Sequence, residues 1–440
     1  MIPALATLAL LLQPVTAGTQ TMPDSLPAPP AAMIDTVLLS GNETTKDYVI
    51  INEMSLHPGM PAAPEAMAYD RNRIYSLGLF TRVDLTLESL ADGRTALRVD
   101  VNERWYLIPL PLFGFRDGDL KKVYFGAGLL HNNLSGKNQK LFVSGVLGYN
   151  PSFGLSFSDP LLVPGENLSL GAALNLSRIR NRSEAEASIG GDFDEHHYDI
   201  GLTLGKRLSL FHSVSLSVGW MIVQIDEYRQ GRTVSTDGRD AFLSITLNYT
   251  YDSRDLREYP SQGLLVSGGA TKNGFGESPV NFARYGLDVR SYTLLDGWLT
   301  LGARVAGSVV SGGEIPTSAR SYFGYGERIR GYYTTVFEGE NFLLGTVEAR
   351  FMLLPLRDIR FTAITLPQEF SIWRFGVGFA LFADAGTVWF RGDPLQWSSF
   401  ASGYGASVNW LLPYSVVVRT AYAINDLGRG QFVLDLRLAF

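Results

Sequence analysis

The feature that most constrains this sequence is an alternation of apolar and polar residues that runs from about residue 104 to the end. In the last segment, Phe432 and Leu434 fall on one face of an extended chain, and Val433 and Asp435 fall on the other. Successive side chains of a β-strand point to opposite faces, so this pattern predicts strands with one apolar face. About sixteen such segments, each about 10 to 14 residues long, are separated by turn residues. We therefore expect a mainly β chain.

The apolar faces of these strands can point into a soluble core or outward into lipid. Charged residues make up 18% of the chain, against about 25% in soluble globular proteins. The segments are long enough to cross a hydrocarbon core of about 30 Å, and no run of about 18 apolar residues predicts a transmembrane helix. Because lipid offers no partners for backbone groups, a spanning sheet must close on itself. Residues 104–440 therefore predict a transmembrane antiparallel β-barrel of about sixteen strands.

The first 32 residues have the pattern of an exported chain. Ile2 to Leu12 is an apolar run too short to span a bilayer, and Val15-Thr16-Ala17 fits a small-residue cleavage site. We expect residues 1–17 to form a signal peptide, although its usual positively charged start is missing. Residues 18–32 are rich in proline and predict a linker.

Residues 33–103 combine helical and strand patterns and predict a small α+β domain. The expected elements, in the order β-α-α-β-β, are a strand from Met33 to Leu39, a short helix through Ile51, a helix over Pro64 to Leu77, a strand from Phe80 to Leu87 and a strand from Ala96 to Asn102. Thr44 or Thr45 is positioned to cap the first helix, and Gly78 is expected to end the second. No helix is expected after Glu103.

This domain resembles a POTRA unit, the periplasmic domain of the BamA/TamA-like family of outer-membrane assembly and secretion proteins. The matching residues are Ile34 to Leu39 with Gly41-Asn42, and the string Tyr75-Ser76-Leu77-Gly78-Leu79-Phe80-Thr81-Arg82-Val83. The resemblance assigns Gly41, Gly78, Phe80 and Val83 as POTRA motif residues. It implies one POTRA unit in the periplasm, ahead of a barrel in the bacterial outer membrane.

The barrel region also resembles this family, in motifs that occur in the family's order. They are Tyr251-Asp252-Ser253-Arg254-Asp255 with Pro260-Ser261-Gln262-Gly263, then Ile329-Arg330-Gly331-Tyr332, then Phe382-Ala383-Asp384-Ala385-Gly386-Thr387-Val388-Trp389. The resemblance assigns as barrel motif residues Asp252, Arg254, Asp255, Phe382 and Gly386. Leu438 and the terminal Phe440 resemble the C-terminal assembly signal, although the usual glycine of that signal is not clearly placed.

The resemblance further implies that one long loop, about residues 311 to 341, folds back into the barrel. Arg330, in the motif Ile329-Arg330-Gly331-Tyr332 at its tip, is then expected to contact Asp384 and Glu348 on the inner wall. A guanidinium presents five donors in a fixed fork and keeps its charge, so it can lock a loop onto carboxylates. Gly331 allows a tight turn beside it. The alternative is an ordinary surface-loop arginine.

No residue cluster predicts catalysis or a cofactor. The chain has no cysteine and a net charge of -6, so it offers no thiolate site and no basic patch for nucleic acid. The densest ionisable cluster contains Asp192, Asp194, Glu195, His196 and His197. A metal site is one interpretation of it, but we favour a solvated loop at the barrel rim. We expect no catalytic residue, no metal and no enzyme activity.

Two functions of different classes fit a chain of this design in a lipid bilayer. In the first, the POTRA domain receives unfolded or nascent outer-membrane or exported proteins, with possible periplasmic accessory proteins, and the barrel inserts or exports the client. An exposed POTRA strand edge suits this function, because an added strand gains main-chain hydrogen bonds. The resemblance implies a weak seam between the first and last barrel strands, about Trp105 to Phe115 and Gln431 to Phe440. In the second, the chain is a passive pore or a surface structural protein with a periplasmic partner-binding domain.

Overall fold

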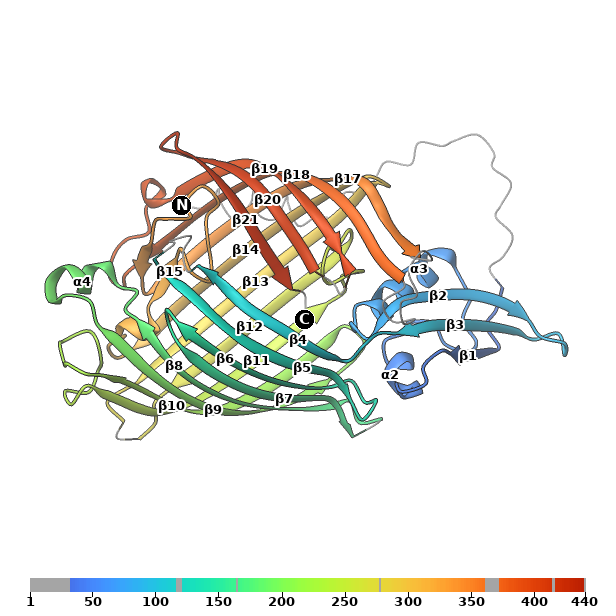
Figure 1. Ribbon diagram of the computed structural model, residues 1–440, viewed down its shortest axis with the longest axis horizontal. Helices are drawn as coiled ribbons and strands as arrows, with labels where there is room; N and C mark the ends of the chain where they lie inside the picture. The colour runs from blue at the N-terminus through green and yellow to red at the C-terminus, as the bar shows by residue number, and fades with distance from the viewer. Residues whose placement is uncertain are drawn as a thin grey trace.

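The computed structural model describes residues 32–115, 121–163, 165–276, 278–360, 372–413 and 416–438. The predicted signal peptide, nearly all of the predicted linker and Phe440 lie outside the described residues, as does the side chain of Leu438. The described part consists of a small α+β domain and a large sheet that curls into a barrel (Figure 1). Among the described residues, no helix has the length and apolar character needed to cross a membrane.

The small domain has the predicted β-α-α-β-β order. Its elements are β1 (Thr36–Ser40), α2 (Asp47–Ile51), α3 (Pro64–Tyr75), β2 (Phe80–Ser89) and β3 (Thr95–Glu103). The sheet order is β1-β3-β2, with β1 parallel and β2 antiparallel to the central strand. The fully buried side chains of this domain come from both helices and the central strand, and they include Ile50, Ile74, Leu97 and Val99. The two helices therefore cover one face of the three-stranded sheet.

Two details of these helices differ from the prediction. The first helix begins at Asp47, and neither Thr44 nor Thr45 caps it, since its N-cap is Lys46 without a side-chain cap. The hydroxyl of Thr45 instead hydrogen-bonds the hydroxyl of Tyr106, at the start of the barrel, over 3.0 Å. The Thr45 hydroxyl, which the local pattern assigned to the helix cap, therefore makes a tertiary contact instead. The second helix ends at Tyr75, two residues earlier than predicted.

The described residues of the barrel form sixteen strands, which confirms the predicted number and antiparallel arrangement. They are β4 (Leu107–Phe115), β5 (Val123–Leu134), β6 (Gln139–Gly148), β7 (Ser152–Val163), β8 (Leu168–Arg180), β9 (Asp194–Arg207), β10 (His212–Ile225), β11 (Arg239–Asp252), β12 (Gly263–Asn273), β13 (Phe282–Asp296), β14 (Leu299–Gly312), β17 (Asn341–Arg360), β18 (Ile372–Trp389), β19 (Ala401–Leu412), β20 (Val416–Asn425) and β21 (Gly430–Leu438). Each pairs with the next along this order, so β4 and β21 stand at its two ends.

Large apolar side chains cover the outer surface of the strands. Along β9, for example, Ile200, Leu202 and Leu204 are each more than half exposed, while the residues between them are partly buried. Exposed apolar side chains on alternate positions of a sixteen-stranded sheet are the arrangement of a barrel in lipid. The strands are tilted, and the small domain lies at one end of the barrel (Figure 1).

The loop between β8 and β9 contains the helix α4 (Glu184–Gly190), at the end of the barrel away from the small domain (Figure 1). The expectation of no helix after Glu103 is therefore wrong. The local signal was present: the hydroxyl of Ser183 accepts the backbone N–H of Glu186, and Ser-x-x-Glu is a capping-box pattern. This short helix was not predicted because the alternating pattern of the flanking strands is much stronger.

Candidate functional site

The segment between β14 and β17 folds back into the barrel. It contains the short helix η2 (Thr317–Ala319) and the strand pair β15 (Ser321–Phe323) and β16 (Phe337–Gly339). Phe323 and Ile329 are each 1% exposed and belong to one apolar cluster with Leu344 of β17. Apolar packing therefore holds this loop against the inner wall of the barrel.

Arg330 of this loop lies against two carboxylates of the barrel wall. Its Nε donates to Asp384 Oδ2 and its Nη2 to Asp384 Oδ1, both over 2.6 Å, and its Nη1 donates to Glu348 Oε1 over 2.6 Å. The guanidinium carbon also lies 3.7 Å from the centre of the Phe382 ring. All three charged side chains are buried. We call Arg330, Glu348 and Asp384 the loop cluster. The two-pronged contact of Arg330 with Asp384 fixes the orientation of the guanidinium as well as pairing its charge.

Close backbone approaches surround the loop cluster. Gly331 has a φ of +99°, which L side chains rarely adopt. A Cβ at Gly403 of β19 would lie 1.8 Å from the carbonyl oxygen of Arg330, and one at Gly386 of β18 would lie 2.8 Å from the Phe323 ring. Gly331 and Gly386 belong to the predicted motifs, whereas no feature of the sequence singled out Gly403.

The remaining residues of the loop motif also contact the wall. Ile329 belongs to the buried apolar cluster of the loop, together with Tyr332. The hydroxyl of Tyr332 hydrogen-bonds the carboxylate of Asp426, in the turn after β20. The structure therefore brings together the four predicted loop residues and the two predicted wall residues, near β17, β18 and the end of β20.

Glu348 contacts further arginines that were not predicted. Arg350 of β17 donates to Glu348 over 2.7 Å, and Arg419 of β20 approaches to 3.9 Å. Glu348 and Arg350 are two residues apart on one strand and therefore share a face, which is a signal that the sequence did contain. Arg419 lies 71 positions away along the chain, and only the curvature of the sheet brings it close.

A second arginine binds the same loop. Arg304 of β14 donates to Glu327 of the loop over 2.7 and 2.9 Å and to Asp288 of β13 over 2.9 Å. A cavity of about 490 Å³ lies beside these groups, and half of its lining residues are charged, including Arg304, Glu327, Arg330 and Glu348. The lumen is therefore polar and partly filled by paired charges.

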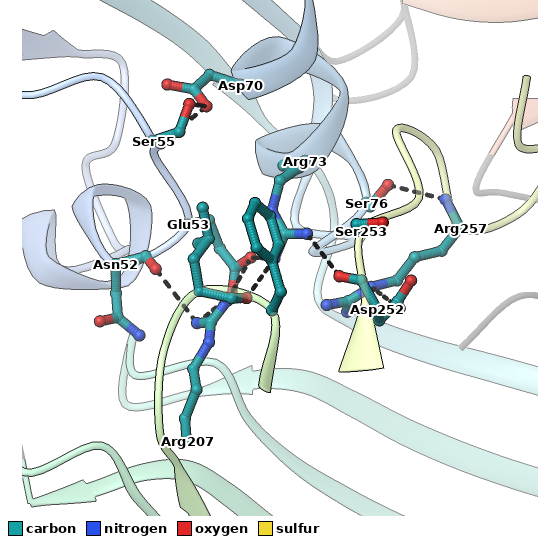
Figure 2. Close-up of polar contacts among 12 residues, drawn as sticks. Asn52, Glu53, Ser55, Asp70, Arg73, Ser76, Arg207, Asp252, Ser253 and Arg257 are labelled. Atoms are coloured by element: carbon teal, nitrogen blue, oxygen red, sulfur yellow. Dashed lines mark hydrogen bonds and ion pairs between the residues drawn. The ribbon is translucent and has the colours of Figure 1, made fainter. Parts of the chain in front are cut away.

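A different cluster joins the small domain to the barrel (Figure 2). Arg73 of α3 donates to Glu53 over 2.9 Å, and Arg207, at the end of β9, donates to the two oxygens of Glu53 over 2.8 and 3.1 Å. Arg73 also reaches the main-chain oxygens of Leu210 and Asp252, over 3.3 and 3.4 Å. We call Glu53, Arg73 and Arg207 the docking cluster. None of the three was predicted as a site residue.

Charge and burial act in opposite directions on Glu53. Burial raises the pKa of this carboxyl, but the neighbouring guanidinium groups of Arg207, Arg257 and Arg73 outweigh it and hold the pKa below its ordinary value. Glu53 therefore stays ionised in the docked arrangement and neutralises cations from both domains.

Aromatic side chains add to the contact between the small domain and the barrel. Tyr69 of α3 meets Phe211, in the turn after β9, edge to face with ring centres 6.3 Å apart. Tyr75 lies under the guanidinium of Arg374 at 4.1 Å, and burial raises the pKa of Tyr75 to about 12. The apolar core of the small domain also continues into barrel residues, among them Leu256. The two domains therefore share one core.

The predicted motif at the end of β11 forms a turn that faces the small domain. Arg254 binds Asp252 through Nε and Nη2 over 2.8 and 3.0 Å, and Asp255 accepts three hydrogen bonds from the far side of the same turn. The carbonyl of Ser253 accepts the hydroxyl of Tyr69 over 3.2 Å. Asp252, Arg254 and Asp255 therefore have a different role from the loop cluster. They shape the turn against which the small domain docks.

The predicted POTRA motif residues have structural positions within the small domain. Gly41 has a φ of +81°, and a Cβ there would lie 1.9 Å from the carbonyl oxygen of Val101. Gly78 has a φ of +71° and follows α3. Phe80 and Val83 are buried in the core. Gly41, Phe80 and Val83 therefore support the fold of the domain, while Gly78 also contacts the barrel, because its carbonyl oxygen accepts the side-chain amide of Asn132 of β5 over 2.7 Å.

The acidic and histidine cluster is not a solvated loop, and that prediction is wrong. Four of its residues, from Asp194 to His197, form the start of β9. Arginines of β8 pair with its acids: Arg180 with Asp192, and Arg178 with Asp194. Within the described ranges, no three or more histidine, cysteine or acidic side chains are placed to hold a metal ion.

A polar lumen, an outward apolar surface and a small β-α-α-β-β domain docked at one end define an outer-membrane β-barrel with a periplasmic domain. The chain belongs to the Omp85 superfamily, because the family model described as the Omp85 superfamily domain matches residues 133–434. The POTRA model, described as a surface antigen variable number repeat, matches residues 32–104. The barrel lies in the outer membrane, and the POTRA domain lies in the periplasm.

A sequence relative and several solved structures resemble the chain. The outer membrane protein assembly factor BamA of Nitratidesulfovibrio vulgaris Hildenborough is 24% identical over 315 residues, which are 68% of this chain but only 37% of that protein. The chain thus spans little more than a third of that relative's length. BamA from Haemophilus ducreyi lacking POTRA domains 1–3 has a TM-score of 0.55 at 14% identity, covering 92% of this chain and 85% of that chain.

CdiB from Escherichia coli has a TM-score of 0.55 at 13% identity, with 92% of this chain and 75% of that chain covered. Identities this low establish a shared fold.

Proposed function

We propose that this chain inserts or translocates other proteins at the outer membrane, with outer-membrane or exported proteins as its clients. The observation that carries the proposal is the pair of strands at the ends of the sheet order: no strand of the described sheet adjoins the outer side of β4 or of β21. In lipid, a free edge leaves backbone groups without partners, which is costly. Such an edge is therefore a place where an incoming strand can pair.

The POTRA domain offers an edge for the first contact with a client. β2 is one of the two edge strands of its sheet, and the far end of β2 is solvent-exposed, with Leu87 42% exposed. Main-chain hydrogen bonds along such an edge bind extended chains with little demand on their sequence. Periplasmic accessory proteins belong to the same proposal, because they would use this surface or deliver clients to it.

The loop cluster is proposed to hold the inward loop in place while a client passes the seam. The loop occupies the lumen and is fixed by Arg330 and Arg304, which is an arrangement suited to assembly at the barrel wall rather than to free diffusion through the centre. No covalent chemistry is part of this proposal: the chain is not an enzyme, and the folding free energy of the client drives the process.

The domain limits that accompany this function are also proposals. They assign residues 1–17 to a signal peptide, 18–32 to a linker, 33–103 to the POTRA domain and 104–440 to the barrel. A barrel that needs its terminal assembly signal, Leu438 and Phe440, would itself be a client of the assembly machinery.

Depletion of the protein in its host tests the proposed function. We expect the abundance of several other outer-membrane proteins, measured by quantitative mass spectrometry of the outer membrane, to fall before growth stops. Unchanged outer-membrane composition, together with reduced uptake of a small solute, would contradict the proposal and support the passive pore. Crosslinking through the exposed end of β2 identifies the clients in parallel.

A further inference from the structure

A cavity of about 280 Å³ lies where the POTRA domain meets the barrel, and we call it the junction cavity. Its lining comes from four parts of the chain: residues 76–78 after α3, Arg104 between β3 and β4, the hairpin of β5 and β6, and the turn between β11 and β12. Among the described residues, it shares no lining residue with the cavity beside the loop cluster. Pockets that bind small molecules have volumes of about 300 to 1,000 Å³, so the junction cavity suits a small chemical group.

Positive charge dominates the lining of the junction cavity. The cations are Arg104, Lys140, Arg254 and Arg257, and the one acid among the described lining residues is Glu258. Outside the lining, Asp252 binds Arg254 over 2.8 and 3.0 Å but lies 3.7 Å from Arg257. Even with both acids counted, two positive charges remain unbalanced. The cavity therefore attracts anions.

Lys140 of β6 carries the least balanced of these charges. The neighbouring Leu141 is 38% exposed on the outer face, so Lys140 points inward. Within the described part of the chain, its ammonium group makes no hydrogen bond or ion pair, and the charges that act on it are those of Arg104 and Arg257, which repel it. A charge withdrawn from water is costly unless it is paired. A bound anion would supply the missing partner.

Two buried asparagines of the same hairpin also lack partners on the cavity side. Asn132 is 0% exposed and Asn138 is 8% exposed, both line the cavity, and the side-chain oxygen of each has no hydrogen-bond partner in the described residues. Buried polar atoms are nearly always hydrogen-bonded, so such atoms call for a ligand or water. An amide carries two N–H donors beside its oxygen, and rotation of the Asn138 amide would present them to the cavity.

We propose that the junction cavity binds a phosphate group, with Lys140, Arg104 and Arg257 as cationic contacts and Asn138 as a neutral donor. These side chains come from three separate parts of the chain and converge on one cavity, which suits an anion with oxygens on several sides. Guanidinium groups bind phosphate through two parallel N–H groups, and lysine binds it as a point charge. A phospholipid headgroup at the periplasmic face and a small phosphate ester in the periplasm share this chemistry. Neither ligand depends on the proposed clients.

A phosphate in the junction cavity would also link the two domains. Residues 76–78 of its lining belong to the POTRA domain, and Lys140 belongs to the barrel. The backbone N–H of Arg257 already donates to the hydroxyl of Ser76 over 3.2 Å (Figure 2). Arg257 also acts on Glu53 of the docking cluster. The bound phosphate should therefore stabilise the docked arrangement alongside the docking cluster.

Thermal unfolding of the full-length protein tests the site. The protein is kept in a detergent with sugar headgroups, which contains no phosphate, and the temperature at which it loses heat-modifiable mobility in gels is measured. A ligand that binds only the folded state raises this temperature. We expect inorganic phosphate to raise it more than sodium chloride of the same ionic strength, which screens the charges without filling the site. Hydrogen exchange of α3 should become slower in phosphate.

Substitution of Lys140 provides the second measurement. Lys140→Gln should weaken the apparent affinity for inorganic phosphate at least tenfold, or about 1.4 kcal/mol, whereas Lys140→Arg should retain binding. Without phosphate, Lys140→Gln should unfold at or above the temperature of the parent chain, because it removes a repelled charge; loss of a purely structural lysine would lower that temperature.

Lys206→Gln is the matched control, because Lys206 is exposed at the end of β9 that meets the POTRA domain and lies 3.8 Å from Glu166. Its response to phosphate should equal that of the parent chain. If Lys140→Gln does not fold, Arg257→Gln tests the same site at a side chain that is 45% exposed.

A short-chain phosphatidylglycerol, added below its micellar concentration, identifies the source of the phosphate. Stabilisation at a concentration at least tenfold lower than that of inorganic phosphate would assign the site to a lipid headgroup, and any weaker effect would assign it to a small phosphate. Two results would overturn the proposal: stabilisation by neither compound beyond that by sodium chloride, or an equal response of Lys140→Gln and the parent chain. Depletion of the protein judges the proposed function separately.

Discussion

The loop cluster and the docking cluster use the same chemistry with the charges reversed. In the loop cluster one arginine, Arg330, is held by two carboxylates, whereas in the docking cluster one carboxylate, Glu53, is held by two arginines. The first ties a loop to its own barrel, and the second ties one domain to another. The difference teaches that a buried guanidinium–carboxylate contact can fix either a segment or a domain interface, depending on which partner is shared.

Replacement of Arg330 should have the largest effect. Arg330→Ala leaves Asp384 buried without its guanidinium, and loss of one partner of a buried pair typically costs about 3 to 5 kcal/mol. Glu348 keeps Arg350, so the loss falls mainly on the contact with Asp384. We expect the loop to become protease-sensitive while the barrel still inserts, as measured by limited proteolysis and heat-modifiable mobility.

The protease sensitivity of the loop in Arg330→Lys should lie between that of the parent chain and that of Arg330→Ala, since a lysine keeps the charge but cannot reproduce the two-pronged contact. The neighbouring Arg328→Ala, which leaves the loop cluster intact, serves as the control. A loop in Arg330→Ala as resistant as in the parent chain would show that apolar packing alone holds it.

Replacement of Glu53 should have the next largest effect, and on the other cluster. Glu53→Gln removes the charge that neutralises Arg73 and Arg207, and we expect docking to weaken by about 2 kcal/mol, below the full cost of a broken buried pair because Arg207 is partly exposed to water. Hydrogen exchange of α3 should become faster, while loop proteolysis stays unchanged.

Glu65→Gln, at an exposed position in the first turn of α3, is the matched control. If α3 exchanged at the parent rate in Glu53→Gln, the shared apolar core would be sufficient for docking and the cluster would be incidental.

The same comparison shows what the sequence could and could not predict. The loop cluster was predicted through the resemblance to the family, because Arg330 and Asp384 each lie in a contiguous motif of that family and Glu348 lies at a matching acidic position. The docking cluster was not, because Glu53 and Arg207 are 154 positions apart and neither lies in a motif. The strand number followed from period-two alternation, whereas the Thr45 cap failed because a tertiary contact with Tyr106 displaced a local one.

Acid should weaken the docking of the small domain through protonation of Glu53. The pKa of Glu53 is held below its ordinary value by three arginines, so its contribution to docking is fully present above the pKa of an unpaired glutamate, about 4.3, and is lost as the pH falls through the lowered value. Docking should therefore be constant from pH 7 to about 5 and weaken only below about 4.

Crosslinking between the POTRA domain and the barrel as a function of pH measures this step. In Glu53→Gln the step should be smaller, with a residual part from Glu103, whose pKa is also lowered, since hydrogen bonds from Thr45 and Thr44 outweigh its burial. Loosening already at pH 6 would mean that a group other than these carboxyls controls docking.

The smallest expected effect is an energetic coupling between the two clusters. Arg350 contacts Glu348 of the loop cluster, donates to the carbonyl of Pro260 over 3.3 Å and lies over the ring of Tyr259 at 5.0 Å. Those two residues belong to the turn between β11 and β12, whose other side accepts the hydroxyl of Tyr69 from the POTRA domain. A chain of contacts therefore joins loop and domain, although contact alone does not establish coupling.

A double-mutant cycle of Arg330→Ala with Tyr69→Phe, read out by exchange of α3, should give a coupling of about 0.5 to 2 kcal/mol. The same cycle in an Arg350→Met background should give a coupling within about 0.5 kcal/mol of zero, because that substitution removes the bridge. If the effects of the two substitutions are additive with Arg350 present, the loop and the domain are fixed independently. The two clusters then use the same chemistry without being energetically coupled.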